Sequence, residues 1–144
     1  MKIVPAALAD SNALCALDHS RAFSAHWSLA GWQAELAQPA SQVWCAQEGE
    51  KLVGFVAIRG VCGQYELLNL AVDPAYSRRG IARALLRAVL DELASQGAEQ
   101  ISLEVSSRNA PAQGLYRSTG FQAVGVRKQF YPDGADALIM EQKL

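Results

Sequence analysis

The chain has 144 residues, of which 51% are apolar and 19% charged, and its formal net charge is −1. This composition excludes a disordered chain, and the near-zero charge argues against a surface that binds nucleic acid mainly through phosphate contacts. No apolar run approaches the roughly 20 residues that span a bilayer, and the N-terminus lacks the features of a signal peptide. We therefore expect a single domain over residues 1–144 that binds neither nucleic acid nor membrane directly. We also expect a cytoplasmic protein and a monomer, although composition and charge do not determine the oligomeric state.

The cysteines and histidines do not indicate a metal site. Cys15, Cys45 and Cys62 are odd in number, far apart and without CxxC spacing, so we expect reduced thiols in the core. His19 and His26 also lack the spacing of metal ligands, and we expect no metal.

The first half of the chain predicts two helices followed by strands. The predicted elements are a strand over Lys2–Val4, a helix from a cap at Asp10 or Ser11 to about Asp18, a helix capped by Ser28, and strands over Ser41–Gln47 and Leu52–Val61. The linker between the helices holds Phe23, His26 and Trp27 in a stretch with little regular pattern. Such an aromatic cluster is typical of a plug that packs on the core, and also of a functional loop.

The stretch from Leu67 to Leu93 organises the rest of the chain. It begins as an apolar strand over Leu67–Val72 and ends as an amphipathic helix that starts near Gly80 and stops before Gly97. The apolar positions at helical spacing are Ala82, Leu85, Leu86, Val89, Leu90 and Leu93.

The turn between this strand and this helix carries Ser77, Arg78, Arg79 and Gly80. Free backbone amides and the positive end of the helix dipole converge there, which favours binding of a phosphate or another anion. The spacing differs from the glycine patterns of dinucleotide folds and P-loops, so the turn alone is also consistent with a strand-to-helix connection that binds nothing.

The last third predicts three more strands, with a short helix after the first of them. The predicted elements are a strand over Gln100–Val105, a helix that Asn109 caps and Gly120 ends, and a closing hairpin over Phe121–Phe130 and Ala137–Gln142. The whole pattern predicts an α/β (α+β) domain with a mixed, mostly antiparallel sheet of about seven strands flanked by four helices.

Two residues of this last third are candidates for acid–base chemistry. Glu104 is a carboxylate inside an apolar strand, where it either faces a cleft as a general base or points to solvent on the polar face. Tyr116 is either a core residue with a hydrogen-bonded hydroxyl or a neutral proton donor with a pKa of about 10.

Several segments resemble a known enzyme family. AVDPAYSRRGIARALL resembles the acetyl-CoA motif (Q/R)-x-x-G-x-(G/A) of the GNAT N-acetyltransferases, with Gly80 and Ala82 matching and Ser77 standing where the family has Gln or Arg. LEVSSRNAPAQGLYRSTGF and RKQFYPDGADALIM resemble the ribosomal-protein-alanine N-acetyltransferases (RimI) within that family. The resemblance covers the chain from Leu67 onward and, more weakly, AFSAHWS in the first half.

The resemblance implies the GNAT acyl-CoA N-acyltransferase fold, acetyl-CoA as cosubstrate and a role for each matching residue. Glu104 would be the general base, Tyr116 the general acid and Asn109 a cofactor contact. The backbone of Leu70, Ala71 and Val72 would pair with the pantetheine, and the diphosphate would lie on Arg78, Arg79, Gly80, Ile81, Ala82 and Arg83. The acceptor peptide would enter between Phe23–Trp27 and Tyr131–Asp136, with Trp27 and Tyr131 as contacts.

By this resemblance the acceptor would be a protein N-terminal amine, that of the N-terminal alanine of the eighteenth protein of the small ribosomal subunit. Asp133 and Asp136 would attract the basic residues that follow the N-terminal alanine of the acceptor. The pair Asp133-Gly134 is also typical of an ordinary turn without any such role. The alternatives are the same chemistry on another protein N-terminus, a lysine or a small amine, or a non-catalytic acyl-CoA sensor. Both Glu104 and Tyr116 argue against the sensor, which needs neither residue.

Overall fold

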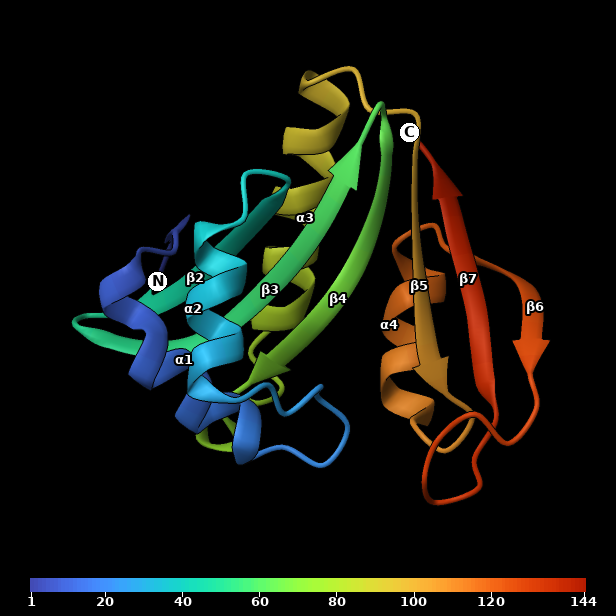
Figure 1. Cartoon of the computed structure of the whole chain (residues 1–144), viewed down its shortest axis with the longest axis horizontal. Helices are drawn as coiled ribbons and strands as arrows, with labels where there is room; N and C mark the ends of the chain where they lie inside the picture. Colours follow the sequence, from blue (N-terminus) through green and yellow to red (C-terminus); the bar gives the residue numbers. More distant parts are fainter.

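Seven strands form one sheet in the computed structural model, which describes residues 1–144 (Figure 1). The strands are β1 (Lys2–Pro5), β2 (Ser41–Glu48), β3 (Lys51–Val61), β4 (Gln64–Val72), β5 (Gln100–Ser106), β6 (Gln122–Arg127) and β7 (Ala137–Lys143). Their order across the sheet is β1-β2-β3-β4-β5-β7-β6, and only β4 and β5 run parallel. The predicted fold class, a mixed and mostly antiparallel sheet, is therefore confirmed.

Four helices flank the sheet, as the sequence predicts. They are α1 (Ser11–His19), α2 (Leu29–Ala37), α3 (Ile81–Ser95) and α4 (Ala110–Ser118), and two single 3₁₀ turns lie at η1 (Leu8–Asp10) and η2 (Pro74–Tyr76). None of the helices is long and apolar enough to cross a bilayer.

The strand β3 is buried on both faces because helices cover the sheet on both sides. Phe55 and Ala57 pack with α1 and α2, whereas Val56 and Ile58 pack with α3 in the larger core. Side chains of a strand alternate between its two faces, so a strand in this position must be apolar almost throughout, and β3 reads LVGFVAI. Figure 1 shows α1 and α2 on the near side of these strands and α3 behind them.

The helix α3 is held by one apolar stripe. Its buried residues are Ile81, Leu85, Leu86, Val89, Leu90 and Leu93, so the stripe begins at Ile81 rather than at the predicted Ala82. Burial of each such side chain contributes about 1.5–3 kcal/mol. Gly80 precedes the helix in the left-handed conformation with φ of 76°, and Gly97 follows it with φ of 77°. Both glycines fix where the helix begins and ends.

The parallel strands β4 and β5 pair over a short stretch and then diverge. Only three residue pairs join them, from Gln64 with Gln100 to Glu66 with Ser102. Beyond this point β4 keeps its pairing with β3, and β5 keeps its pairing with β7. Figure 1 shows the two strands separating towards their arrowheads. The sheet therefore has an unpaired edge on each side of an internal opening.

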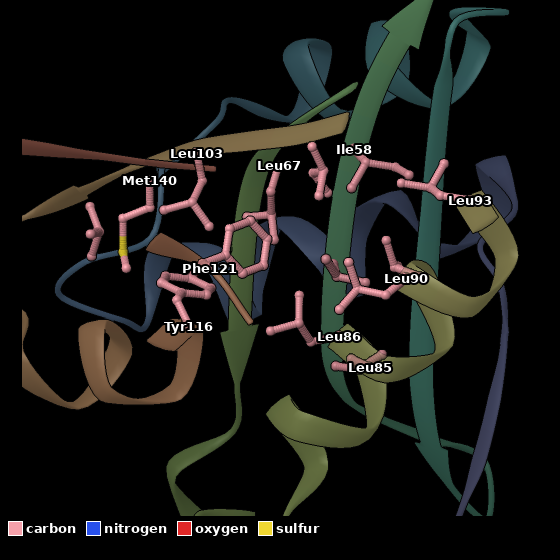
Figure 2. Close-up of a cluster of buried hydrophobic side chains, with 14 of the residues drawn as sticks. Ile58, Leu67, Leu85, Leu86, Leu90, Leu93, Leu103, Tyr116, Phe121 and Met140 are labelled. Carbon is pink, nitrogen blue, oxygen red and sulfur yellow. The ribbon is translucent and has the colours of Figure 1, made fainter. Parts of the chain in front are cut away.

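Side chains from both halves of the sheet fill the space below this opening. Figure 2 shows Leu67 of β4 and Leu103 of β5 near Phe121 and Tyr116, and all four belong to the larger core. The rings of Tyr116 and Phe121 meet edge to face with their centroids 5.7 Å apart. The divergence is thus stabilised by packing.

Two local predictions need correction. Asp10 does not cap α1 with its side chain, because its carboxylate accepts a hydrogen bond from the Ala7 amide at 2.7 Å and closes the preceding 3₁₀ turn. Cys62 is not a core thiol, because it is exposed in the β3–β4 turn with φ of 56°. Cys45 is buried as expected, and burial raises the pKa of its thiol to about 12.

Two glycine-to-alanine variants, one in β3 and one in α4, test the packing around these two positions. A Cβ at Gly60 would lie 2.4 Å from the Gln64 carbonyl oxygen and 2.4 Å from the Tyr65 ring, so Gly60→Ala should lower the free energy of unfolding by about 1–3 kcal/mol. Gly114, exposed in α4, leaves open space for a Cβ, so Gly114→Ala should raise it by up to about 1 kcal/mol. Urea denaturation measures both, and equal stabilities for the two variants would contradict the packing described.

Candidate active site

The turn before α3 presents a run of free backbone amides. None of the amides of residues 78–83 donates a hydrogen bond within the chain, and the first amide bonded at this helix end is that of Ala84, to the Gly80 carbonyl at 2.9 Å. Arg78 and Gly80 both have left-handed φ, of 62° and 76°. Together with the positive end of the helix dipole, these amides make a site for an anion, and the first turn of α3 contains no acidic residue.

Side chains around the turn give it shape and positive charge. Ser77 donates from its hydroxyl to the Pro74 carbonyl at 2.9 Å, so it closes η2. The Arg79 guanidinium lies over the Tyr76 ring, 4.9 Å from its centroid, and Lys51 lies 5.2 Å from the same centroid. Two cationic side chains therefore lie against the Tyr76 ring, near the free amides.

The unpaired edge of β4 can accept an extended ligand. Hydrogen-bonded residues alternate along an antiparallel strand, and Asp73 donates to the Val53 carbonyl at 2.8 Å. The backbone of Ala71 therefore faces β3, whereas the backbone groups of Leu70 and Val72 face the opening between β4 and β5. These groups are the ones that an added strand would use.

Glu104 lies on the diverged part of β5, two residues beyond its last pair with β4. Its side chain is 24% exposed, and its Oε1 lies 3.3 Å from Nε of Arg127 on β6. Arg127 also lies over the Phe130 ring, 5.5 Å from its centroid. The carboxylate is therefore half-buried and held by a neighbouring guanidinium, and the sequence does not predict this ion pair. No spacing along the chain indicates this contact, because β7 separates the two strands.

Tyr116 presents a protonated phenol from α4. Its ring is buried in the core, and burial, followed by the nearby Tyr131, raises the pKa of its hydroxyl well above the ordinary value. The hydroxyl donates to no protein group, and it is not among the fully buried side-chain atoms that lack a partner. This leaves an un-ionised O–H that can act on a ligand.

Tyr131 joins the two candidates. It lies in the loop between β6 and β7, where burial and then the negative charges of Glu104 and Asp133 raise the pKa of its hydroxyl. Tyr131 in turn raises the pKa of Tyr116. Tyr131 is therefore linked electrostatically both to Glu104 on β5 and to Tyr116 on α4.

Residues 12–121 match the Acetyltransferase (GNAT) family. N-alpha-acetyltransferase RimI of Mycobacterium tuberculosis is 43% identical over 121 residues, which cover 81% of this chain and 75% of that protein. The chain belongs to the GNAT acetyltransferase family. The family predicted from the RRGIA turn and the LEV and LY segments is therefore confirmed.

Two further comparisons, one of sequence and one of structure, name a ribosomal-protein acetyltransferase of Escherichia coli. The ribosomal protein bS18-alanine N-acetyltransferase of Escherichia coli K12 is 43% identical over 93 residues, 62% of this chain and 63% of that protein, so the match spans less than two thirds of its length. The crystal structure of the ribosomal-protein-S18-alanine N-acetyltransferase from Escherichia coli superposes with a TM-score of 0.91 at 31% identity, covering 99% of this chain and 92% of that one.

GNAT acetyltransferases use acetyl-CoA, and the chain's own groups fit this ligand. The free amides of residues 78–83 suit a diphosphate, and the open edge at Leu70 and Val72 suits the amides of a pantetheine arm. Asn109 caps α4 by accepting from the Ala112 amide at 3.3 Å, which leaves its Nδ2 free to donate to a ligand.

The two predicted acceptor loops lie at the same end of the GNAT domain. Figure 1 shows the α1–α2 loop (residues 20–28) and the β6–β7 loop (residues 128–136) beyond the arrowheads of β4 and β5, on opposite sides of the opening. Trp27 packs edge to face on Trp32, with centroids 4.8 Å apart, and lines a groove of about 510 Å³ beside α2 that also includes Leu68 of β4. That groove contains neither Glu104 nor Tyr116.

The carboxylates of the β6–β7 loop are already in use within the chain. Asp133 pairs with Arg108 at 3.2 Å and accepts from the Ala135 amide at 2.9 Å. Asp136 pairs with Lys128 at 3.6 Å and accepts from the Gln129 amide at 2.9 Å. Both residues shape the loop, and each carboxylate is paired with a cation of the chain.

The anion site can be tested with two glycine-to-aspartate variants. CoA at about 100 times its Kd should stabilise the wild type by about 2.7 kcal/mol and raise Tm by several degrees. Gly80→Asp should abolish this shift by placing a carboxylate at the free amides. Gly49 is the matched control, since it also has left-handed φ and open space for a side chain but lies in the β2–β3 turn. Differential scanning fluorimetry measures the shifts, and equal CoA responses in both variants would refute the site.

Proposed function

We propose that this chain is an acetyl-CoA-dependent N-alpha-acetyltransferase that acts on a protein N-terminal amine, that of the N-terminal alanine of ribosomal protein bS18. The observation that carries this proposal is the opening between β4 and β5, which is bordered by the unpaired edge of β4, the free amides before α3 and the half-buried Glu104 on β5. The names of the M. tuberculosis and E. coli relatives support the acceptor. A ribosomal acceptor would place the enzyme in the cytoplasm.

In this proposal one residue accepts a proton from the attacking amine, and another donates a proton to the departing sulfur. Acetyl-CoA supplies an acetyl thioester. Glu104 takes a proton from the attacking amine, directly or through one water, while Arg127 orients its carboxylate. Tyr116 gives its proton to the departing sulfur, and its raised pKa keeps that proton in place until it is needed. No residue needs to form a covalent bond to the acetyl group.

The pKa of the acceptor amine favours an N-terminal amine over a lysine as the substrate. An α-amine has a pKa of about 8, so about one molecule in ten is neutral at pH 7. A lysine, with a pKa of about 10.4, would cost about 3 kcal/mol more to deprotonate. A single carboxylate such as Glu104 therefore suffices more readily for the N-terminal amine.

The catalytic assignment predicts a separation of binding from turnover. Glu104→Gln and Tyr116→Phe keep the shape of each side chain and remove only its proton chemistry, so kcat should fall about 10²-fold or more while the CoA-induced Tm shift persists. Tyr65→Phe, on β4, is the control for loss of a phenol hydroxyl. Wild-type turnover in both variants would leave the protein as an acyl-CoA binder without catalysis.

The acceptor assignment is tested by a panel of amines followed by mass spectrometry. Peptides that begin with Ala and continue with Arg should be acetylated at the α-amine, faster than peptides beginning with Met, free lysine or spermidine. Tyr131→Phe removes one neutral hydrogen bond to the peptide and should raise the peptide KM about 3- to 10-fold, with the KM for acetyl-CoA nearly unchanged. A preference for spermidine, together with indifference to Tyr131, would assign the enzyme to small amines.

A further inference from the structure

Asp18, at the end of α1, carries a buried negative charge that no cation balances. Its side chain is fully buried, and none of the six ion pairs of the protein includes it. A carboxylate in such a position is stable only when hydrogen-bond donors surround it.

Four donors converge on this carboxylate, and three of them come from the α1–α2 loop and the helix after it. The amide of His26 donates to Oδ1 at 2.8 Å, and the amide of Trp27 donates to Oδ2 at 2.8 Å. The Trp32 indole N–H donates to Oδ2 at 3.1 Å. The fourth donor is the side-chain amide of Asn69, which reaches Oδ2 at 3.1 Å from β4.

Asn69 holds the same loop from the opposite side. It is buried, and its Oδ1 accepts from the Ala25 amide at 3.1 Å. The amides of three consecutive loop residues, 25 to 27, are therefore bound by only two side chains. Asn69 lies within the unpaired part of β4 and directly precedes Leu70, so one residue joins the loop to the strand expected to hold the pantetheine.

The loop conformation depends on this pair. His26 is in the left-handed region with φ of 59°, which costs a non-glycine residue energy that surrounding bonds must offset. Trp27 then lies against Trp32, and Trp32 lies against Phe55 of β3 with centroids 4.9 Å apart. The position of Trp27 is thus fixed both by its amide and by its ring.

We propose that Asp18 and Asn69 form a positioning pair that holds Trp27 and the α1–α2 loop in place for the acceptor peptide; this inference rests on the proposed function. The pair sets the distance between the acceptor loop and the open edge of β4, and it touches neither the anion site nor Glu104. Only a carboxylate at position 18 can serve, because an asparagine would turn one of its acceptor atoms into a donor facing other donors.

The test compares Asp18→Asn and Asn69→Ala with the wild-type full chain. Asp18→Asn turns one acceptor of the His26 and Trp27 amides into a donor, and Asn69→Ala leaves the Ala25 amide without its acceptor. The peptide KM should therefore rise at least about tenfold, while the KM for acetyl-CoA and the CoA-induced Tm shift stay within about twofold of wild type. Asn69→Ala keeps three of the donors to Asp18, so it remains informative if Asp18→Asn does not fold. Ser20→Ala is the control, since Ser20 bonds only the Leu17 carbonyl at the same end of α1.

Amide hydrogen exchange gives a second readout that does not depend on activity. Exchange should accelerate at least about tenfold at residues 26 and 27 in Asp18→Asn and at residue 25 in Asn69→Ala, and it should remain unchanged in Ser20→Ala. Equal rises in both KM values, or faster exchange without a change in the peptide KM, would overturn the positioning role. If the wild type binds CoA but acetylates no peptide, the proposed function is contradicted instead. If exchange at residues 25–27 is unchanged in the variants, the positioning role of Asp18 and Asn69 is contradicted, whatever the function is.

Discussion

The strands β4 and β5 are parallel neighbours that pair over three residues and then separate, and the site depends on this geometry. A parallel pair requires a crossover, here the turn and α3, so the N-terminus of α3 follows the carboxyl end of β4. The free amides, the unpaired edge and the end of β5 that carries Glu104 therefore belong to the same region. An extended ligand with an anionic end meets backbone groups at Leu70, at Val72 and along residues 78–83.

The core beneath the opening holds Tyr116, one of the candidate catalytic residues. Tyr116 belongs to the same core as Leu67, Leu103 and Phe121, as Figure 2 shows. Its ring is therefore fixed by apolar contacts from both diverging strands, and its hydroxyl is the only polar atom that this position offers to a ligand. The burial that raises its pKa is the burial that holds it in place. In the proposed mechanism Tyr116 would be both proton donor and core residue, and its ring would need little further support from hydrogen bonds.

The sequence predicts the elements well where periodicity and capping agree. The apolar stripe of α3 lies between Gly80 and Gly97, and the caps at Ser28 and Asn109 both accept the expected amides. It cannot predict contacts between strands that are distant along the chain, such as Arg127 with Glu104. The sequence does indicate that Asp18 is unusual, because it follows Leu14 by four residues and therefore lies on the buried face of its helix. A charged residue at a core position indicates a network of donors, although the spacing cannot name its partner Asn69, 51 residues away.

The buried charge of Asp18 also orders events during folding. Two of its donors are local amides, but the other two come from Trp32 and from Asn69 on β4. Until β4 has paired with β3, the carboxylate lacks its most distant donor and is better solvated by water than by protein. The α1–α2 loop therefore reaches its final shape only after the centre of the sheet has formed in the correct register. A chain with misaligned strands would lack this loop conformation, so the complete loop requires the correct register of β4.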